Sequence, residues 1–253
     1  MTKVILKTLS IIFFFILCFI GYFSLVGFET KSFNNQIKGN LKKIDTKLDV
    51  KLNNVKIVLD LFNFKINTKT LGPIISYNNK SIDLELIKSD VSLLNLLNDQ
   101  FTLSNLYIST KSVKIKEVIA FYRSINKNNK AKLFILENFI NKGFLIADIN
   151  LNFDDQGKLK KDFKINGLIR DSSLNFLNKQ KIDNINFIFG AENKKLNLND
   201  LKFSYSNINF VSEKVEVENK DSLINIKGEI NNGGTSLSEN SLKKFFNPFL
   251  KLD

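Results

Sequence analysis

Three pairs of acidic side chains come closest to a catalytic or metal-binding arrangement. They are Asp83 with Glu85, Asp154 with Asp155, and Glu216 with Glu218. Paired carboxylates can transfer protons or bind a divalent cation. The two residues of the first pair, and of the third pair, are two positions apart in a segment where polar and apolar residues alternate. We therefore expect each pair to lie on the solvent face of a strand. The sequence DDQG at 154–157 is typical of a hairpin turn, and the other oxygen ligands of an EF-hand do not accompany it.

The residue types that most enzymes need are scarce in these 253 residues. There is no histidine and one cysteine, Cys18. The absence of histidine excludes Ser-His-Asp and Cys-His nucleophile systems and nearly every catalytic zinc site. No GxGxxG, Walker A, GxSxG or CxxC motif is found. We therefore predict that the protein is not an enzyme and binds no cofactor or metal.

The net charge of +12 does not indicate a nucleic-acid partner. Only two of the 37 basic residues are arginines, Arg123 and Arg170. Nucleic-acid readers use arginine for bidentate contacts and gather their basic residues on one element. Here the lysines are spread along the chain among Asp, Glu and Asn. We interpret the charge as a solvated basic surface and expect no nucleic-acid binding.

The N-terminal segment predicts a membrane span. From Leu9 to Phe28 about 20 residues carry no charge, enough for a helix to cross a hydrocarbon layer of about 30 Å. A signal peptide is the alternative, with Lys3 and Lys7 before the apolar run. No small-x-small pair marks a convincing cleavage position, so we favour an uncleaved anchor. The sequence thus predicts a transmembrane anchor at 1–30 and a β-rich domain at 31–253.

After residue 36 the apolar residues alternate with polar ones, which predicts strands with one apolar face. Examples are the segments 48–52, 55–59, 62–66, 82–86, 145–153, 163–169, 185–189, 201–205, 215–217 and 224–230. Turn sequences every 8 to 15 residues favour an antiparallel meander over βαβ units. An apolar-x-Gly-x-apolar pattern recurs around Gly39, Gly167 and Gly228, and we interpret it as strand bulges, bends or close backbone approaches.

A few segments predict short helices. Residues 91–97 (VSLLNLL) suit one or two turns after Asp90 as N-cap, and 118–125 has helical apolar spacing. A last amphipathic helix is expected near 236–248. For 131–143 both a helix and a hairpin fit, and we favour the hairpin because an alternating strand follows directly. The predicted fold is therefore mainly β: an N-terminal transmembrane helix, then a curved, groove-like antiparallel sheet with a few short helices.

The apolar face of this sheet is rich in Phe, of which the chain has 24. Two interpretations are open. The face packs on another layer and forms a closed core, or it stays partly open as a groove that shields lipid acyl chains at about 0.8 kcal/mol per buried methylene. The pattern alone favours the closed core.

The run at 81–115 carries a family resemblance. It reads as a strand, a Ser-Leu-Leu-x-Leu-Leu turn, a polar step and a strand of the type Leu-x-x-Leu-x-Ile-x-x-x-x-Val-x-Ile. With the N-terminal anchor before it, this resembles the N-terminal region of the AsmA-like group, which includes the larger TamB and YhdP proteins. The strands with Asp148 to Gly157, Gly167, Ile185 to Phe189 and Gly228 are similar to the repeated groove strands of that group.

The resemblance implies an inner-membrane protein of a bacterium, with a periplasmic β-groove that carries phospholipid in lipid transport or outer-membrane biogenesis. Its partners would be the membrane, lipid acyl chains and a further envelope protein, and it raises the open groove above the closed core. The residues we expect to line the groove are Phe62, Phe64, Ile66, Ile82, Leu84, Leu86, Phe187 and Phe189. The alternative is an anchored periplasmic β-sandwich, similar to the scaffold of lipopolysaccharide export, that binds a protein through a sheet edge.

The orientation of the anchor is a testable prediction. Lysines at 3 and 7 precede the span, whereas those at 31, 38, 42 and 43 follow it. A short basic N-terminus before a first span stays in the cytoplasm, and a long domain is translocated despite its charge. A periplasm-active reporter fused after Asp253 is expected to be active. Activity of a cytoplasm-specific reporter alone would reverse the orientation.

Overall fold

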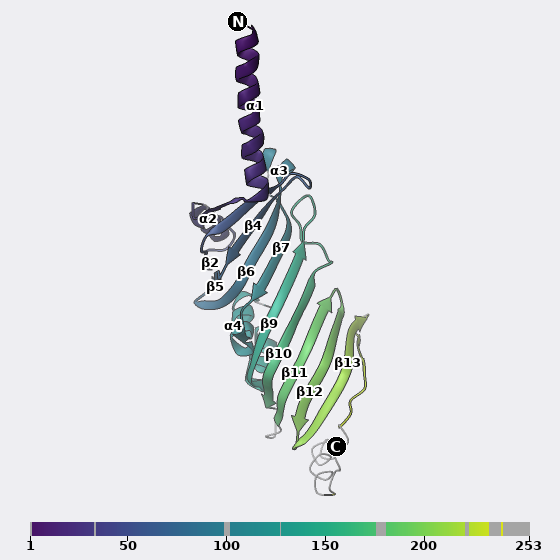
Figure 1. Ribbon diagram of the computed structural model, residues 1–253. Helices are drawn as coiled ribbons and strands as arrows, with labels where there is room; N and C mark the ends of the chain where they lie inside the picture. Colours follow the sequence, from purple (N-terminus) through teal and green to yellow (C-terminus); the bar gives the residue numbers. More distant parts are fainter. Residues whose placement is uncertain are drawn as a thin grey trace. The chain divides into compact units, whose positions relative to one another are not determined.

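The computed structural model describes residues 2–32, 34–98, 102–126, 128–175, 181–220, 223–232 and 239. Figure 1 shows a helix followed by a succession of neighbouring strands with short helices beside them. The described helices are α1 (Thr2–Leu25), α2 (Asn34–Ile44), α3 (Leu93–Leu97), α4 (Ile115–Ile125) and α5 (Lys130–Phe139).

The strands are short near the N-terminus and long in the second half of the chain. The first eight are β1 (Phe28–Thr30), β2 (Leu48–Lys51), β3 (Val55–Asp60), β4 (Lys65–Leu71), β5 (Ile74–Tyr77), β6 (Lys80–Ser92), β7 (Leu103–Thr110) and β8 (Val113–Lys114). The remaining six are β9 (Ile140–Asn152), β10 (Lys164–Asn175), β11 (Lys181–Glu192), β12 (Lys195–Tyr205), β13 (Ile208–Lys220) and β14 (Leu223–Gly228).

Within the described residues the strands form one 14-stranded antiparallel sheet. Its main order is β1-β3-β4-β6-β7-β9-β10-β11-β12-β13-β14, with β2, β5 and β8 paired off this path. The order begins and ends at different strands, so the sheet is not closed. This confirms a mainly β chain with an antiparallel meander. The chain divides into two compact units, residues 1–74, 84–108 and 150–160, and residues 75–83, 109–149 and 161–253.

Helix α1 coincides with the apolar N-terminal segment. Residues 3–25 have a mean hydropathy of 2.6 and no buried side chains, so the helix is long and apolar enough to cross a membrane. An anchor and a signal sequence share these properties, and the helix is consistent with both. The helix begins earlier than the uncharged run because Lys3 and Lys7 are accommodated in its first turns.

Two of the helix predictions are confirmed and one is wrong. Helices α3 and α4 form where the spacing indicated, although Ser92, not Asp90, caps α3 by accepting a hydrogen bond from Asn95 N. The favoured hairpin at 131–143 is wrong, because α5 occupies 130–139 and β9 begins directly at Ile140. The predicted helix near 236–248 lies outside the described residues apart from position 239.

The predicted strands are largely confirmed, with two differences. The segment around Gly39 belongs to helix α2, so its interpretation as a strand is wrong. Phe62 and Phe64 lie in the turn between β3 and β4, and the strand begins only at Lys65. The Asp60 carboxylate accepts hydrogen bonds from the backbone and side-chain nitrogens of Asn63, at 3.1 and 2.8 Å. These hydrogen bonds stabilise a turn at 61–64, where the sequence pattern predicted that the strand had already begun.

Gly167 on β10 confirms the expected close approach. A Cβ added there would lie 2.5 Å from the Ile146 carbonyl oxygen and 2.5 Å from the Phe189 ring. Phe189 is the direct cross-strand partner of Gly167, so its ring fills the space that a side chain would take. The glycine therefore lets a large aromatic ring lie flat against the sheet.

We predict that Gly167→Ala destabilises the fold. The added methyl group overlaps backbone and ring atoms, which typically lowers the free energy of unfolding by about 1 to 3 kcal/mol. Urea unfolding of the full chain in detergent measures this. Gly190→Ala on the neighbouring strand is the matched control, since its Cβ would meet only Asn166 Oδ1 at 3.3 Å. Equal stability of both variants would contradict the assigned packing.

Candidate functional site

The candidate site is the apolar face of the sheet formed by β10–β14, all in the second unit. Cross-strand pairing places apolar residues opposite one another on this face: Ile169 with Phe187, Phe189 with Leu198, and Leu198 with Val215. We call this surface the apolar sheet face. It comprises Ile165, Ile169, Phe187, Phe189, Leu196, Leu198, Leu201, Phe203, Phe210, Val215, Val217, Ile224 and Ile226.

The opposite face is mostly polar. Asn166, Asn186, Asn197 and Glu216 alternate with the members of the apolar sheet face along their strands, and Ile188 is an exposed apolar exception. Successive side chains of a strand point to opposite sides, so polar and apolar residues that alternate in sequence separate onto the two faces. The sheet therefore has one apolar face and one mostly polar face.

Irregularities in the strands keep the apolar residues on one side. Asp171, Asn184 and Asp200 have φ angles of 51°, 54° and 52°, and the strand registers shift next to each of them. On β12 the apolar residues change from 196 and 198 to 201 and 203, which is a slip of one position. The bulge at Asp200 absorbs this slip, so both sets remain on the apolar sheet face.

One end of this unit is covered by a helical pair. Ile115 and Ile119 of α4 form a buried cluster with Ile140, and Leu133, Leu145, Ile169 and Leu174 pack against it. Arg123 joins the two helices by an ion pair with Glu137 at 3.0 Å, and its guanidinium lies 5.2 Å from the centre of the Phe134 ring. The cover therefore contacts β10, where Ile169 belongs to both the cluster and the apolar sheet face.

Beyond this cluster most of the apolar sheet face is incompletely buried, although Val215 is buried. Phe187, Phe189, Leu198 and Phe203 are half-buried, whereas the centre of a closed two-layer core is fully buried. At the last strand, Ile224 and Ile226 are 69% and 68% exposed. The aromatic rings also contact one another: the Phe187 and Phe189 rings lie edge to face at 6.3 Å, and Phe203 stacks on Phe210 at 5.1 Å.

The structure brings together only some of the predicted groove residues. Phe187 and Phe189 are neighbours on the apolar sheet face. Ile82, Leu84 and Leu86 share one face of β6, and Leu84 is 3% exposed. Ile66 pairs with Val91, whereas Leu86 pairs with Leu71, and this register puts Ile66 on the opposite face of the sheet from Leu86.

Phe62 and Phe64 lie in the β3–β4 turn of the first unit and not on a strand, and Phe62 is 96% exposed. The sequence reasoning left out the residues of β12–β14 that accompany Phe187 and Phe189. The signal was present as the alternating runs at 196–198, 201–205, 215–217 and 224–226. Only the positions of the bulges show that these runs face the same side.

The acidic pairs occupy the positions that alternation predicts. Asp83 and Glu85 are exposed on β6, and the Asp154 carbonyl accepts a hydrogen bond from Gly157 N at 2.9 Å, which confirms the hairpin turn. A hydrogen bond from Lys214 holds the pKa of Glu216 below its usual value. Lys220, 3.2 Å away, does the same for Glu218. The described residues hold no group of three His, Cys, Asp or Glu side chains placed for a metal ion.

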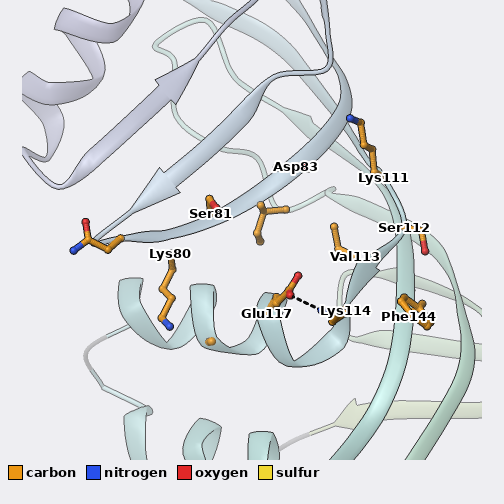
Figure 2. A pocket seen from close by; sticks show the side chains of 12 residues that line it. Lys80, Ser81, Asp83, Lys111, Ser112, Val113, Lys114, Glu117 and Phe144 are labelled. Carbon is orange, nitrogen blue, oxygen red and sulfur yellow. Dashed lines mark ion pairs between the residues drawn. The ribbon is translucent and has the colours of Figure 1, made fainter.

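A pocket of about 480 Å³ with a mixed polar and apolar lining lies between the β5–β6 turn, β8 and α4, and Ile82 is one of its lining residues. Figure 2 shows Lys80 and Lys111 on opposite sides of this pocket, with their ammonium groups pointing away from each other. Lys114 Nζ is 3.3 Å from Glu117 Oε1, so its charge is already balanced. The lining therefore has no convergent set of groups for binding or catalysis.

Comparisons of the chain with protein-family models, with curated proteins and with solved structures find no match.

The ion pair between Lys214 and Glu216 on β13 predicts how the stability of the fold depends on pH. The pKa of Glu216 is lowered in the folded protein, so its stabilising contribution is present above the unfolded value of about 4.3 and is lost as the pH falls through the lower folded value. Lys214→Met is expected to raise this pKa towards that of an ordinary glutamate in an NMR titration. Lys202→Met, a change at an exposed lysine outside this pair, is the control. An ordinary Glu216 pKa in the unmodified protein would refute the assignment.

Proposed function

We propose that this protein is a non-enzymatic, membrane-anchored lipid-binding protein of the bacterial envelope. In this proposal α1 anchors it in the inner membrane, the β-sheet lies in the periplasm, and the apolar sheet face shields acyl chains during phospholipid transport or outer-membrane biogenesis. The observation that carries the proposal is the incomplete burial of a continuous apolar surface across five strands.

The size and chemistry of this surface support a lipid ligand. It contains four phenylalanines, and its other members are all aliphatic. An acyl chain needs no directional partner, only surface from which water is excluded, and each methylene buried there contributes about 0.8 kcal/mol. The resemblance to the AsmA-like group supports the same ligand class, because the proteins of that group share an anchor followed by groove-forming strands.

The edge strand β14 supports a second candidate function, an interaction module without lipid cargo. Leu223 and Ile224 are each 69% exposed, and Lys227 is the single charged residue of the strand. Exposed apolar edge strands are suited to pairing with a strand of another protein. In this case the sheet edge would bind an envelope protein, and the apolar sheet face would be covered by that partner.

Site-specific crosslinking in living cells tests the proposal. A photoreactive amino acid in place of Leu198 is expected to crosslink radiolabelled phospholipid, because Leu198 lies between Phe189 and Val215 at the centre of the apolar sheet face. The same amino acid in place of Asn197 is the matched control, since this neighbour points to the polar face. We expect at least a tenfold difference in lipid yield between the two positions.

Two outcomes would contradict lipid binding. Equal lipid labelling at positions 197 and 198 would indicate contact with bulk membrane and not with a ligand on one face. A single protein adduct at position 198, or at Ile226 on the edge strand, with no lipid adduct would favour the interaction module.

A further inference from the structure

A second apolar surface lies in the first unit, at the end of the sheet from which α1 departs. The helix ends at Leu25, and β1 begins three residues later, paired with β3 through Phe28 and Ile57. The backbone nitrogens of Val26 and Gly27 both donate to the Tyr22 carbonyl, at 2.9 and 3.2 Å. The turn is therefore fixed by hydrogen bonds to the helix itself.

Packing reinforces this junction. A Cβ on Gly27, whose φ is +70°, would overlap the Ile57 carbonyl oxygen, so the chain lies directly on β3 there. The Phe23 ring of α1 contacts the Phe28 ring edge to face at 5.1 Å. Because β1 and β3 are antiparallel, the end of β3 at Asp60 extends towards α1. The membrane helix and the β3–β4 turn thus belong to the same end of the unit.

Two further segments are joined to this turn, α3 directly and the turn after β9 through α3. Leu93 N at the start of α3 donates to the Phe64 carbonyl at 2.9 Å. The Asn95 side chain of α3 donates to the Asp155 carbonyl at 3.3 Å, which brings in the turn after β9. Contacts of α1 with β3 and of α3 with β4 place both helices on neighbouring strands of this unit, and Figure 1 draws both at the end from which α1 departs. The β3–β4 turn, α3 and the turn after β9, which are distant in sequence, are therefore held together at the end of the unit from which α1 departs.

These three segments expose large apolar side chains. We call this group of side chains the apolar rim, and it comprises Leu61, Phe62, Phe64, Leu94, Leu96, Leu97 and Leu159. Phe62 and Leu97 are 96% and 74% exposed. The Asp60 to Asn63 hydrogen bonds fix the turn that presents Phe62, so its exposure follows from a defined conformation. Such a cluster of apolar side chains on one surface marks an interaction site.

The position of the rim identifies its partner. We propose that the apolar rim inserts into the interfacial region of the same membrane leaflet from which α1 emerges. The rim lies at the end of the unit from which α1 departs, and exposed Lys158 and Lys160 flank Leu159 with charges that suit lipid headgroups. The β2–β3 loop at the other end of β3 instead has Asn53 and Asn54, whose amides bond to Leu71 O and Glu29. Aromatic and aliphatic side chains bordered by lysines are typical of segments that lie in a membrane interface.

This contact does not depend on a lipid cargo. With the helix alone, the first unit would tilt with the helix as the helix tilts in the bilayer. A second contact, through the β3–β4 turn, α3 and the turn after β9, would fix the orientation of the first unit relative to the bilayer and place its strand ends against the lipid.

Depth-dependent fluorescence quenching of the full chain tests the proposal. In a Cys18→Ser background, cysteines at Phe62 or Leu97 are labelled with an environment-sensitive dye, and the protein is reconstituted into nanodiscs of phosphatidylethanolamine and phosphatidylglycerol. We expect nitroxide-labelled lipids to quench both dyes at least threefold more than a dye at the control position. Water-soluble iodide is expected to quench them less.

Lys69→Cys is the matched control, because it is exposed on β4 of the same unit and lies about 16 Å along the strand from Phe64. Equal lipid and iodide quenching at positions 62, 97 and 69 would overturn the proposal. Circular dichroism of each labelled variant verifies that the fold is retained. Because the dyes report only the rim, their result is independent of lipid crosslinking at Leu198, and the two proposals can fail separately.

Discussion

Side-chain alternation along paired strands is the constraint on which the second unit depends. A strand has two faces, and a single inserted residue would move every following apolar side chain into water. The chain contains such slips, for example between Leu198 and Leu201, and on β10, β11 and β12 a residue of positive φ lies at the slip. Asp and Asn occupy these positions at Asp171, Asn184 and Asp200, because their short polar side chains tolerate the left-handed region. The continuous apolar sheet face exists only because these bulges coincide with the slips in the pattern.

The two helices α4 and α5 cover only part of the apolar sheet face. Helices α4 and α5 cover the surface around Ile140 and Ile169, and the Arg123–Glu137 ion pair holds them together. Further along, the Phe187 ring packs on Phe189 and the Phe203 ring on Phe210, and each contact reduces the apolar area that faces water. With the apolar rim of the first unit, the described residues thus have two apolar surfaces, one in each unit.

Local chemistry explains where the sequence pattern misled. The helix α5 and the hairpin were both compatible with 131–143, and the packing of Leu133 on Ile115 and Ile119 selected the helix. Around Gly39, alternating apolar residues also fit the spacing of α2, which packs on β2 and pairs Lys38 with Asp49 at 3.0 Å. At Phe62 the hydrogen bonds from Asn63 to Asp60 stabilise a turn, although the apolar residues alternate there as in a strand. In each case a contact made by a distant or polar residue decided between two local patterns.

The sequence by itself determined the fold class, the apolar helix at the N-terminus and the positions of most strands, because these follow from apolar runs and alternation that are local along the chain. It also determined the solvent-facing positions of Asp83 and Glu85. Only the tertiary structure decided which strands share a face, since this depends on register and bulges between neighbours. It likewise placed Ile66 and Leu86 on opposite faces and Phe62 in an exposed turn. Pairing brings together residues that are far apart in sequence, and no local pattern encodes which of them will meet.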